Sequence, residues 1–171
     1  IPLIVRWPGR VAAGTRQDAF VCLGDFFATC AEVLGKSLPP TVAEDSISFL
    51  PLLQGRPVAA SRDHLILHSI NGSFAVRQGK WKLELCPGSG GWSAPRPGRD
   101  ATADLPRFQL YDLERDPGEQ TNLVTAHPEV VQRLGRLLRS YILEGRSTPG
   151  PSQPNTSSPR WPQTAWMEEF R

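Results

Sequence analysis

Hydrophobic and polar residues alternate through the middle of the chain, between Asp63 and Trp92. A short apolar run, Leu65–Leu67, is followed by Phe74–Arg77 and Lys80–Leu85, where every second residue is large and apolar. A period of two is typical of strands that bury one face and expose the other. This stretch therefore predicts three consecutive antiparallel strands.

Two turn signals separate these strands. Asn71-Gly72 is a strong hairpin signal, and Gln78-Gly79 supplies the second turn. Because successive strands run in opposite directions, the loop after the first strand and the loop after the third emerge at the same edge of the sheet. The polar and aromatic residues of that edge are the candidates for ligand binding: His68, Ser69, Asn71, Ser89 and Trp92.

Some of these candidates have an alternative interpretation. Asn71 also serves as a hairpin-turn residue, and His68 also fits an exposed position at a strand end. The glycine-rich loop Pro87–Trp92 lets the backbone approach a ligand closely, and Trp92 offers a flat face to a sugar or aryl ring. The alternative for this loop is a flexible segment whose tryptophan packs on a neighbouring domain.

An amphipathic helix is the clearest element after the sheet. From Pro128 to Ile142, apolar residues recur at i, i+3, i+4 and i+7, and Gly145 ends the pattern. Phe108–Leu113 has strand character. Because the helix must bury its apolar stripe, we predict an α+β fold in which a small antiparallel sheet is packed by this C-terminal helix.

The sequence pattern of the N-terminal part indicates that it belongs to a different domain. Ile1–Trp7 has the pattern of a buried strand, Asp25 is a candidate N-cap for a helix that Gly35 stops, and a short helical turn follows around 48–54. A lone buried strand needs a sheet to join, and no parallel partner is evident downstream. We therefore expect the true N-terminus to be missing, and the strand and helix to belong to a larger α/β domain.

The expected organisation has three parts. Residues 1–57 form the tail end of the α/β domain, and 58–146 form the subdomain of sheet and helix. Residues 147–171 are rich in Pro and Ser and are expected to be disordered or loosely draped. The alternative for this tail is that its large aromatic residues pack onto a surface: Trp161, Trp166 and Phe170.

Composition narrows the classes of function. With 19 basic and 17 acidic residues, the net charge of +2 gives no reason to expect nucleic acid or an anionic membrane as a partner. No apolar run approaches the roughly 20 residues of a membrane helix. The three cysteines, Cys22, Cys30 and Cys86, lack metal-binding spacing, and the aspartates are scattered, so we assign no metal ligand.

Three motifs carry a resemblance to a known family. Pro2–Gly9 is PLIVRWPG, Asp45–Gly55 is DSISFLPLLQG, and Leu110–Leu123 is LYDLERDPGEQTNL. In this order and spacing they resemble the C-terminal part of the sulfatase family, within the alkaline phosphatase superfamily. The resemblance covers residues 1 to about 145. Ser46 departs from a glycine that is frequent in the family, at a turn.

The resemblance implies hydrolysis of sulfate esters of a small molecule or glycan. The family's nucleophile is a formylglycine made from Cys or Ser in a C/S-x-P-S/A-R motif, but the segment Cys86–Gly90 (CPGSG) has the wrong spacing and no arginine, and Cys22 and Cys30 do not match either. By resemblance, the nucleophile and the ligands of the divalent metal, usually calcium, lie in an N-terminal catalytic domain upstream of Ile1. We therefore expect no catalytic residue in this chain, which would be inactive alone and would line the substrate cleft.

Two other functions stay open. A phosphonate or phosphodiester hydrolase of the same superfamily shares this architecture. A carbohydrate-binding or structural module that has lost its catalytic half is a candidate from a different class. Since many sulfatases are exported, the resemblance also implies an extracytoplasmic location, either periplasmic or secreted.

Overall fold

The structure is a computed structural model that describes residues 2–57, 62–96, 99–155 and 161–171. The chain divides into two compact units. The first comprises Ile1–Asp63 and Gly145–Gln153, and the second comprises His64–Glu144 and Pro154–Arg171. Four pieces named above lie outside the described residues: Ile1, the start of the expected second domain at 58–61, positions 97–98, and 156–160 of the tail.

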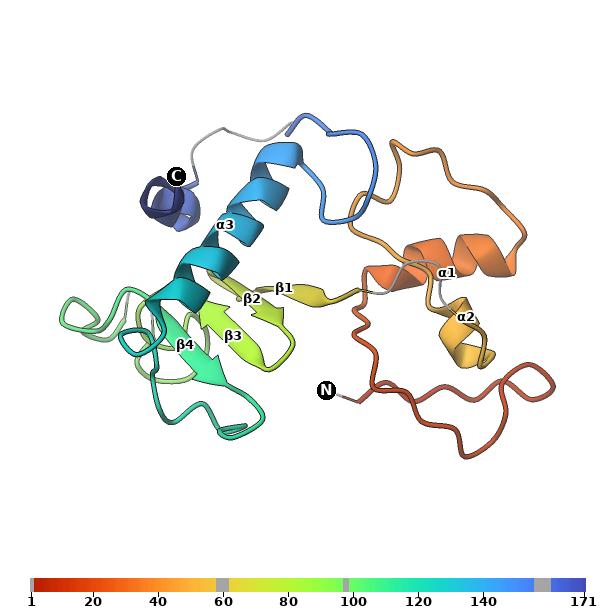
Figure 1. Cartoon of the computed structure of the whole chain (residues 1–171), viewed down its shortest axis with the longest axis horizontal. Helices are drawn as coiled ribbons and strands as arrows, with labels where there is room; N and C mark the ends of the chain where they lie inside the picture. Colours follow the sequence, from red (N-terminus) through yellow and green to blue (C-terminus); the bar gives the residue numbers. More distant parts are fainter. Residues whose placement is uncertain (1, 58–61, 97–98, 156–160) are drawn as a thin grey trace. The chain divides into compact units, whose positions relative to one another are not determined.

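A four-stranded sheet forms the centre of the second unit, with strand order β1-β2-β3-β4 and every neighbouring pair antiparallel. Its strands are β1 (His64–His68), β2 (Phe74–Gln78), β3 (Trp81–Glu84) and β4 (Gln109–Asp112) (Figure 1). The register pairs Val76 with both Ile66 and Leu83, and Leu83 with Leu110. These aliphatic side chains share one face, as the alternation predicts.

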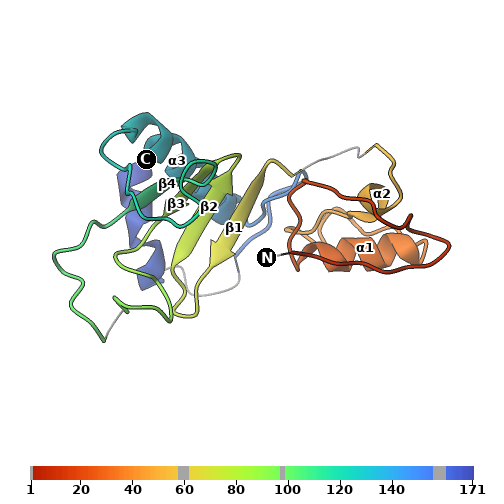
Figure 2. The same cartoon turned by 90° about the horizontal axis from the view of Figure 1, so that it is seen from below.

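Helix α3 (Pro128–Glu144) covers this apolar face of the sheet (Figures 1 and 2). Its buried stripe includes Val131, Leu134 and Leu138, which join the aliphatic row of the strands in one core. The side chains recur every three or four residues, so one side of the helix supplies all the contacts. The predicted α+β architecture of an antiparallel sheet packed by a C-terminal helix is confirmed.

The end of the chain is folded, so the expectation of a disordered or loosely draped tail is wrong for Pro162–Phe170, and the alternative in which the aromatic residues pack is confirmed for Trp166 and Phe170. Pro162–Phe170 forms the 3-10 helix η1, and its Trp166 and Phe170 are buried in the core beside α3. The Phe170 ring lies against Gly135 of α3, where an added Cβ would come within 2.3 Å of it. These two aromatic side chains supply apolar area that the Pro- and Ser-rich sequence before them lacks.

The segment Gly145–Gln153, which contains the first part of the predicted tail at 147–153, belongs to the first unit. Ser147 donates to Asp45 Oδ1 from both its backbone nitrogen (2.9 Å) and its hydroxyl (2.7 Å). The buried guanidinium of Arg146 satisfies backbone carbonyls that a Pro-rich loop would otherwise leave unpaired. Those carbonyls belong to Pro40, Thr148, Pro149 and Pro151.

Helices α1 (Asp25–Val33) and α2 (Leu50–Leu53) belong to the first unit. Asp25 is not the N-cap predicted above, because Gly24 holds that position without a side-chain cap. The buried Asp25 carboxylate instead accepts hydrogen bonds from the backbone nitrogens of Cys22 (2.8 Å) and Ile47 (2.9 Å). Its role is therefore to join α1 to the segment before α2.

Residues Pro2–Trp7 do not form the predicted buried strand. Ile4 is 88% exposed and Leu3 is also exposed. A strand requires a hydrogen-bonded neighbour, and among the described residues the strands β1 to β4 pair only with one another. Pro2–Trp7 are therefore not a strand in this structure, and their pairing with a sheet of the expected larger domain stays a prediction. Within the described ranges, no helix is long and apolar enough to cross a membrane.

Candidate functional site

The loop between β1 and β2 and the loop after β3 meet at one end of the sheet, as the strand directions predict. Gly90 is the point of contact, because a Cβ there would lie 2.8 Å from Cys86 Sγ, 3.4 Å from Ser73 Cβ and 3.7 Å from Ser69 Oγ. Gly90 also has a φ of +63°, which favours glycine. We call residues 68–73 and 86–92 together the loop edge.

Hydrogen bonds close the β1–β2 loop on itself. Ser69 Oγ donates to Asn71 Oδ1, and the backbone nitrogen of Ser73 donates to both oxygens at 3.0 Å. Gly72 N donates to Ser69 O at 3.0 Å. Asn71 is therefore a turn residue through its oxygen. Its amide nitrogen makes no hydrogen bond within the described part of the chain, so it keeps two donors for a ligand.

The loop after β3 is held by its own hydrogen bonds and by β4. Ser89 Oγ donates to Ser93 O at 2.5 Å and accepts from Gly91 N at 3.1 Å. Gln109 on β4 donates to Cys86 O (3.0 Å) and to Gly88 O (2.7 Å). The hydroxyl hydrogen of Ser89, like that of Ser69, is thus already used inside its loop.

His68 and Trp92 present aromatic rings at the loop edge. The exposed His68 ring lies 4.5 Å from the Phe74 ring and 6.3 Å from the Trp161 ring, centroid to centroid. Trp92 is 80% exposed. Of the five predicted residues, Ser69 lies against Gly90 of the glycine-rich loop, and Ser89 is bonded inside that loop. Asn71 is held in the turn of the β1–β2 loop, His68 lies between aromatic neighbours, and Trp92 is open.

Cys86 lies at the loop edge but is buried. Burial raises the pKa of its thiol, and the hydrogen bond with Ser73 only partly opposes this effect. A thiol with a raised pKa is protonated at neutral pH and is a poor nucleophile. Burial and the raised pKa of the thiol therefore make Cys86 a poor nucleophile in this structure.

The lysines of β3 and of the turn before it are held in ion pairs. Lys82 Nζ lies 2.7 Å from carboxylate oxygens of both Glu84 and Glu119, and Lys80 Nζ lies 2.7 Å from Asp112 Oδ2. The hydrogen bond from Lys80 lowers the pKa of Asp112. These ammonium groups are neutralised by carboxylates, which makes them poor candidates for binding a sulfate at the loop edge.

Asn122 and Asp116 hold the backbone around β4 and the turn that follows it. Asn122 Oδ1 accepts from the backbone nitrogens of Leu110 and Val124 at 3.0 Å each, which fixes β4 to the segment before α3. Asp116 Oδ2 accepts from Gln120 N and from a neighbouring backbone nitrogen at 2.8 Å. These side chains close turns and do not belong to the loop edge.

No group of three or more His, Cys, Asp or Glu is placed to hold a metal ion anywhere in the described ranges. A calcium ion needs several converging oxygen ligands. The residues described in this chain therefore do not fit a calcium site, and we derive no step through such an ion.

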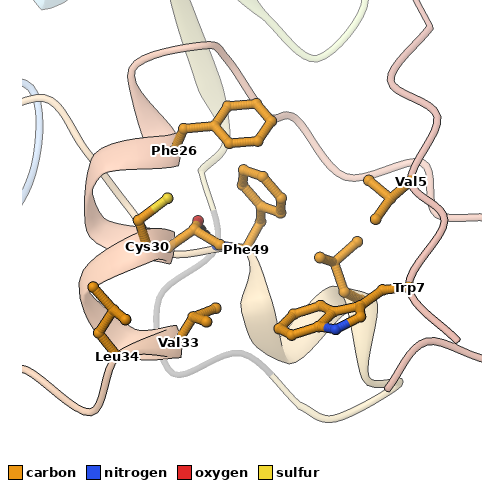
Figure 3. A pocket seen from close by; sticks show the side chains of 9 residues that line it. Val5, Trp7, Phe26, Cys30, Val33, Leu34 and Phe49 are labelled. Carbon is orange, nitrogen blue, oxygen red and sulfur yellow. Dashed lines mark hydrogen bonds between the residues drawn. The ribbon is translucent and has the colours of Figure 1, made fainter. Parts of the chain in front are cut away.

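An open apolar hollow of about 360 Å³ lies in the first unit. The Thr29 hydroxyl at its wall donates to Asp25 O (2.7 Å) and accepts from Phe49 N (3.1 Å). None of the described residues that line the hollow is charged, so these residues offer apolar contact and not the donors that a sulfate needs. Figure 3 shows α1 side chains on one side and two N-terminal side chains opposite: Phe26, Cys30, Val33 and Leu34, facing Val5 and Trp7.

Sequence patterns did not identify two residues that shape the loop edge, Gln109 and Gln163, and they indicated packing of Trp161 without identifying its partner. Gln163 Nε2 donates to the backbone oxygen of Asn71 at 2.7 Å across 92 positions of sequence. The alternation in β4 places Gln109 on the face away from Leu110, but it does not indicate that its amide reaches the next loop. No local signal marks Gln163 or names His68 as the neighbour of Trp161, because these contacts depend on the tertiary fold.

Known proteins similar to this chain are sulfatases. The N-acetylgalactosamine-6-O-sulfatase of Bacteroides thetaiotaomicron is 36% identical over 143 residues, which cover 82% of this chain and 27% of the relative. Human arylsulfatase A is 34% identical over 166 residues, which cover 89% of this chain and 32% of the relative. The chain thus spans less than a third of these relatives' lengths. No protein-family model matches it.

Two solved structures are similar to this chain in fold. A structure from Bacteroides thetaiotaomicron, described with its metabolism of multiple glycosaminoglycans, has a TM-score of 0.53 and 35% identity, covering 68% of this chain and 24% of that one. A protein in complex with its substrate D-glucosamine-2-N,6-O-disulfate has a TM-score of 0.59 and 21% identity, covering 80% of this chain and 27% of that one. The second likeness concerns the fold alone.

Proposed function

We propose that this chain is the C-terminal part of an enzyme that hydrolyses sulfate esters of a small molecule or glycan. The chain is homologous to sulfatases over most of its length and corresponds to a fragment of them. The observation that carries the proposal is the 36% identity to N-acetylgalactosamine-6-O-sulfatase over 82% of this chain. A 6-sulfated N-acetylgalactosamine is therefore the first substrate to assay.

Within that enzyme, the chain's own role is to line one wall of the substrate cleft with the loop edge. The amide nitrogen of Asn71 has two donors for a sulfate or sugar oxygen. The exposed ring of Trp92 offers a flat face to a sugar ring, and His68 adds a donor beside it. Ser69 and Ser89 shape the two loops, since their hydroxyl hydrogens are used internally.

The chemical step belongs to residues outside this chain. Cleavage of a sulfate ester needs a positioned nucleophile and positive charge against the oxygens that become negative as the S–O bond breaks. Cys86 is buried with a raised pKa, and the lysines of the sheet are paired with carboxylates. The loop edge therefore binds and orients the substrate, and the chain alone is inactive.

The exposed apolar residues of the first unit fit a contact with another domain of the same protein. Its surface includes Ile4 at 88% exposure, Leu23 at 85% and Leu34 at 72%, together with the apolar hollow. Apolar surface of this kind marks contacts with other protein parts. We assign these contacts to an N-terminal catalytic domain, which would also hold the calcium ion. A periplasmic or secreted location follows from the same resemblance.

Relative activity on different esters tests this function. The complete protein is incubated with N-acetylgalactosamine 6-sulfate, with the matching 6-phosphate, and with a phosphonate monoester and a phosphodiester. Faster release of sulfate than of any phosphorus product supports the proposal. Preference for a phosphodiester or phosphonate would replace it with the related hydrolase, and sugar binding without hydrolysis of any ester would favour a carbohydrate-binding module.

A further inference from the structure

We propose that the C-terminal segment Trp161–Phe170 is a strap that positions the β1–β2 loop for substrate binding, with Gln163 as the positioning residue. This inference rests on the proposed function, which places that loop in the wall of the substrate cleft. The strap lies far from the loop in sequence and touches it in space at His68 and Asn71.

The strap is anchored in the core at its C-terminal end. Trp166 is 3% exposed and Phe170 is 1% exposed. The Trp166 ring lies 6.3 Å from the Phe74 ring at the start of β2, and the Phe170 ring lies 5.4 Å from the Phe108 ring before β4. Because these rings pack against the sheet itself, the strap has a fixed position relative to the strands that carry the loop edge.

From that anchor, Gln163 reaches the turn of the loop. Its Nε2 donates to Asn71 O at 2.7 Å. Its side chain also lies over Gly72, where an added Cβ would be 3.4 Å from Gln163 Cδ and Cγ. Gly72 has a φ of +86°, so a glycine both allows the turn and lets the glutamine approach its backbone.

Trp161 makes the second contact, at the end of β1. Its ring is nearly parallel to the His68 ring, with an interplanar angle of 19° and centroids 6.3 Å apart. The strap thus holds the loop at its start and at its turn. The loop's other hydrogen bonds run between Ser69, Asn71 and Ser73 and fix its shape, while the Cys86 thiol is hydrogen-bonded to Ser73 from the loop after β3.

Binding gains from this arrangement because a preorganised loop loses less conformational freedom when the ligand arrives. The Asn71 side chain and backbone are held by opposite partners: the loop holds the carboxamide oxygen, and the strap holds the carbonyl. The free amide nitrogen of Asn71 is therefore presented in one orientation. Loss of the strap contact would weaken binding more than it would slow the chemical step.

Hydrogen exchange of the complete protein tests the contact itself. Gln163→Met keeps the length of the side chain but removes the donor. We expect the amides of Gly72 and Ser73, which are bonded inside the loop, to exchange roughly fivefold faster. Gln163→Lys, which restores a donor, should bring exchange back toward the original rate, and Gln132→Met on the exposed side of α3 should leave it unchanged.

Steady-state kinetics on the sulfated substrate tests the positioning role. Gln163→Met should raise KM roughly fivefold with kcat within about twofold, and Gln163→Lys should restore KM. Unchanged exchange at Gly72 and Ser73 overturns the strap, and faster exchange with an unchanged KM overturns its role in substrate binding. Absence of sulfatase activity in the unaltered protein overturns the proposed function. The exchange rates still test the contact between Gln163 and the β1–β2 loop in that case.

Discussion

At the scale of single residues, Asp25 shows how one carboxylate organises the first unit. It accepts two backbone hydrogen bonds, and its Oδ1 lies 2.6 Å from Arg62 Nη2. Both side chains are almost fully buried. The same guanidinium nitrogen donates to Asp45 O at 2.8 Å. Each charge of a buried ion pair has lost its water and is compensated by its partner. Removal of one partner therefore destabilises the fold strongly.

Asp25→Asn should therefore destabilise the protein strongly. The substitution keeps the shape of the side chain but leaves the Arg62 charge buried without its counter-ion. We expect the free energy of unfolding to fall by about 3 kcal/mol. Chemical denaturation of the variant measures this loss. Asp18→Asn, at an exposed position, is the matched control and should change the free energy by less than about 0.5 kcal/mol.

Asp112 gives a prediction for pH dependence. The hydrogen bond from Lys80 lowers the pKa of Asp112 in the folded protein, below the roughly 3.9 of an unfolded aspartate. Its contribution to stability is therefore complete above that unfolded pKa and is lost as the pH falls through the folded pKa. Lys80→Met should move the pKa of Asp112 upward. An NMR titration of the carboxyl carbon measures the shift, and an unchanged midpoint would show that Lys80 is not the cause.

At the scale of elements, α3 and η1 share the apolar face of the sheet, and glycine makes their close contact possible. Gly135 lies in the middle of α3, where a glycine is ordinarily less favourable than alanine by about 1 kcal/mol. Here the Phe170 ring occupies the space that a Cβ would need, at 2.3 Å. The contact of η1 with α3 therefore outweighs the intrinsic preference of the helix.

Gly135→Ala should accordingly destabilise the protein, although the same change in an exposed helix would stabilise it. We expect a loss of roughly 1–3 kcal/mol, the usual cost of overpacking, with displacement of Phe170 and Trp166. Denaturation followed by tryptophan fluorescence measures it. In the double variant Gly135→Ala/Phe170→Leu the effect of the alanine should shrink. A stabilising effect of Gly135→Ala alone would disprove the contact.

The sequence predicted those elements whose contacts follow a local period. The row formed by Val76, Leu83 and Leu110 follows from alternation, and the meeting of two loops follows from strand direction. The sequence left two alternatives for the chain end, a disordered tail or packed aromatic residues, because the choice depends on long-range packing. Trp166 and Phe170 lie among residues that indicate disorder, and only the fold shows that Gly135 leaves room for a ring. The same reason hid Gln163 from the candidate site.

The N-terminal segment is not a strand in this structure, for a different physical reason. The aliphatic run at Pro2–Trp7 has the composition of a buried strand, but composition does not supply the hydrogen-bonded neighbour that a strand requires. Ser46 is a converse case, because its hydroxyl accepts from Ala28 N at 2.9 Å. At that turn, the departure from glycine gives α1 a hydrogen bond that the family resemblance did not predict.

At the scale of the whole molecule, we propose that the apolar surface of the first unit contacts a catalytic domain. Cys30 reports on this contact, because it is exposed in this chain and lines the hollow. Iodoacetamide should label Cys30 quickly in the 171-residue chain and at least tenfold more slowly in the complete protein. The buried Cys86 is the internal control and should react slowly in both, as mass spectrometry of the peptides would show. Equal labelling of Cys30 would contradict the contact.

The central claim is that the loop edge selects the substrate and does not cleave it. Its most direct test is the kinetics of sulfate release by the complete protein carrying Trp92→Ala or His68→Ala, two exposed side chains whose removal should spare the fold. We predict that KM for the sulfated sugar rises roughly tenfold while kcat stays within about twofold, with Gln132→Ala as the control. Unchanged kcat/KM in both variants would contradict the claim.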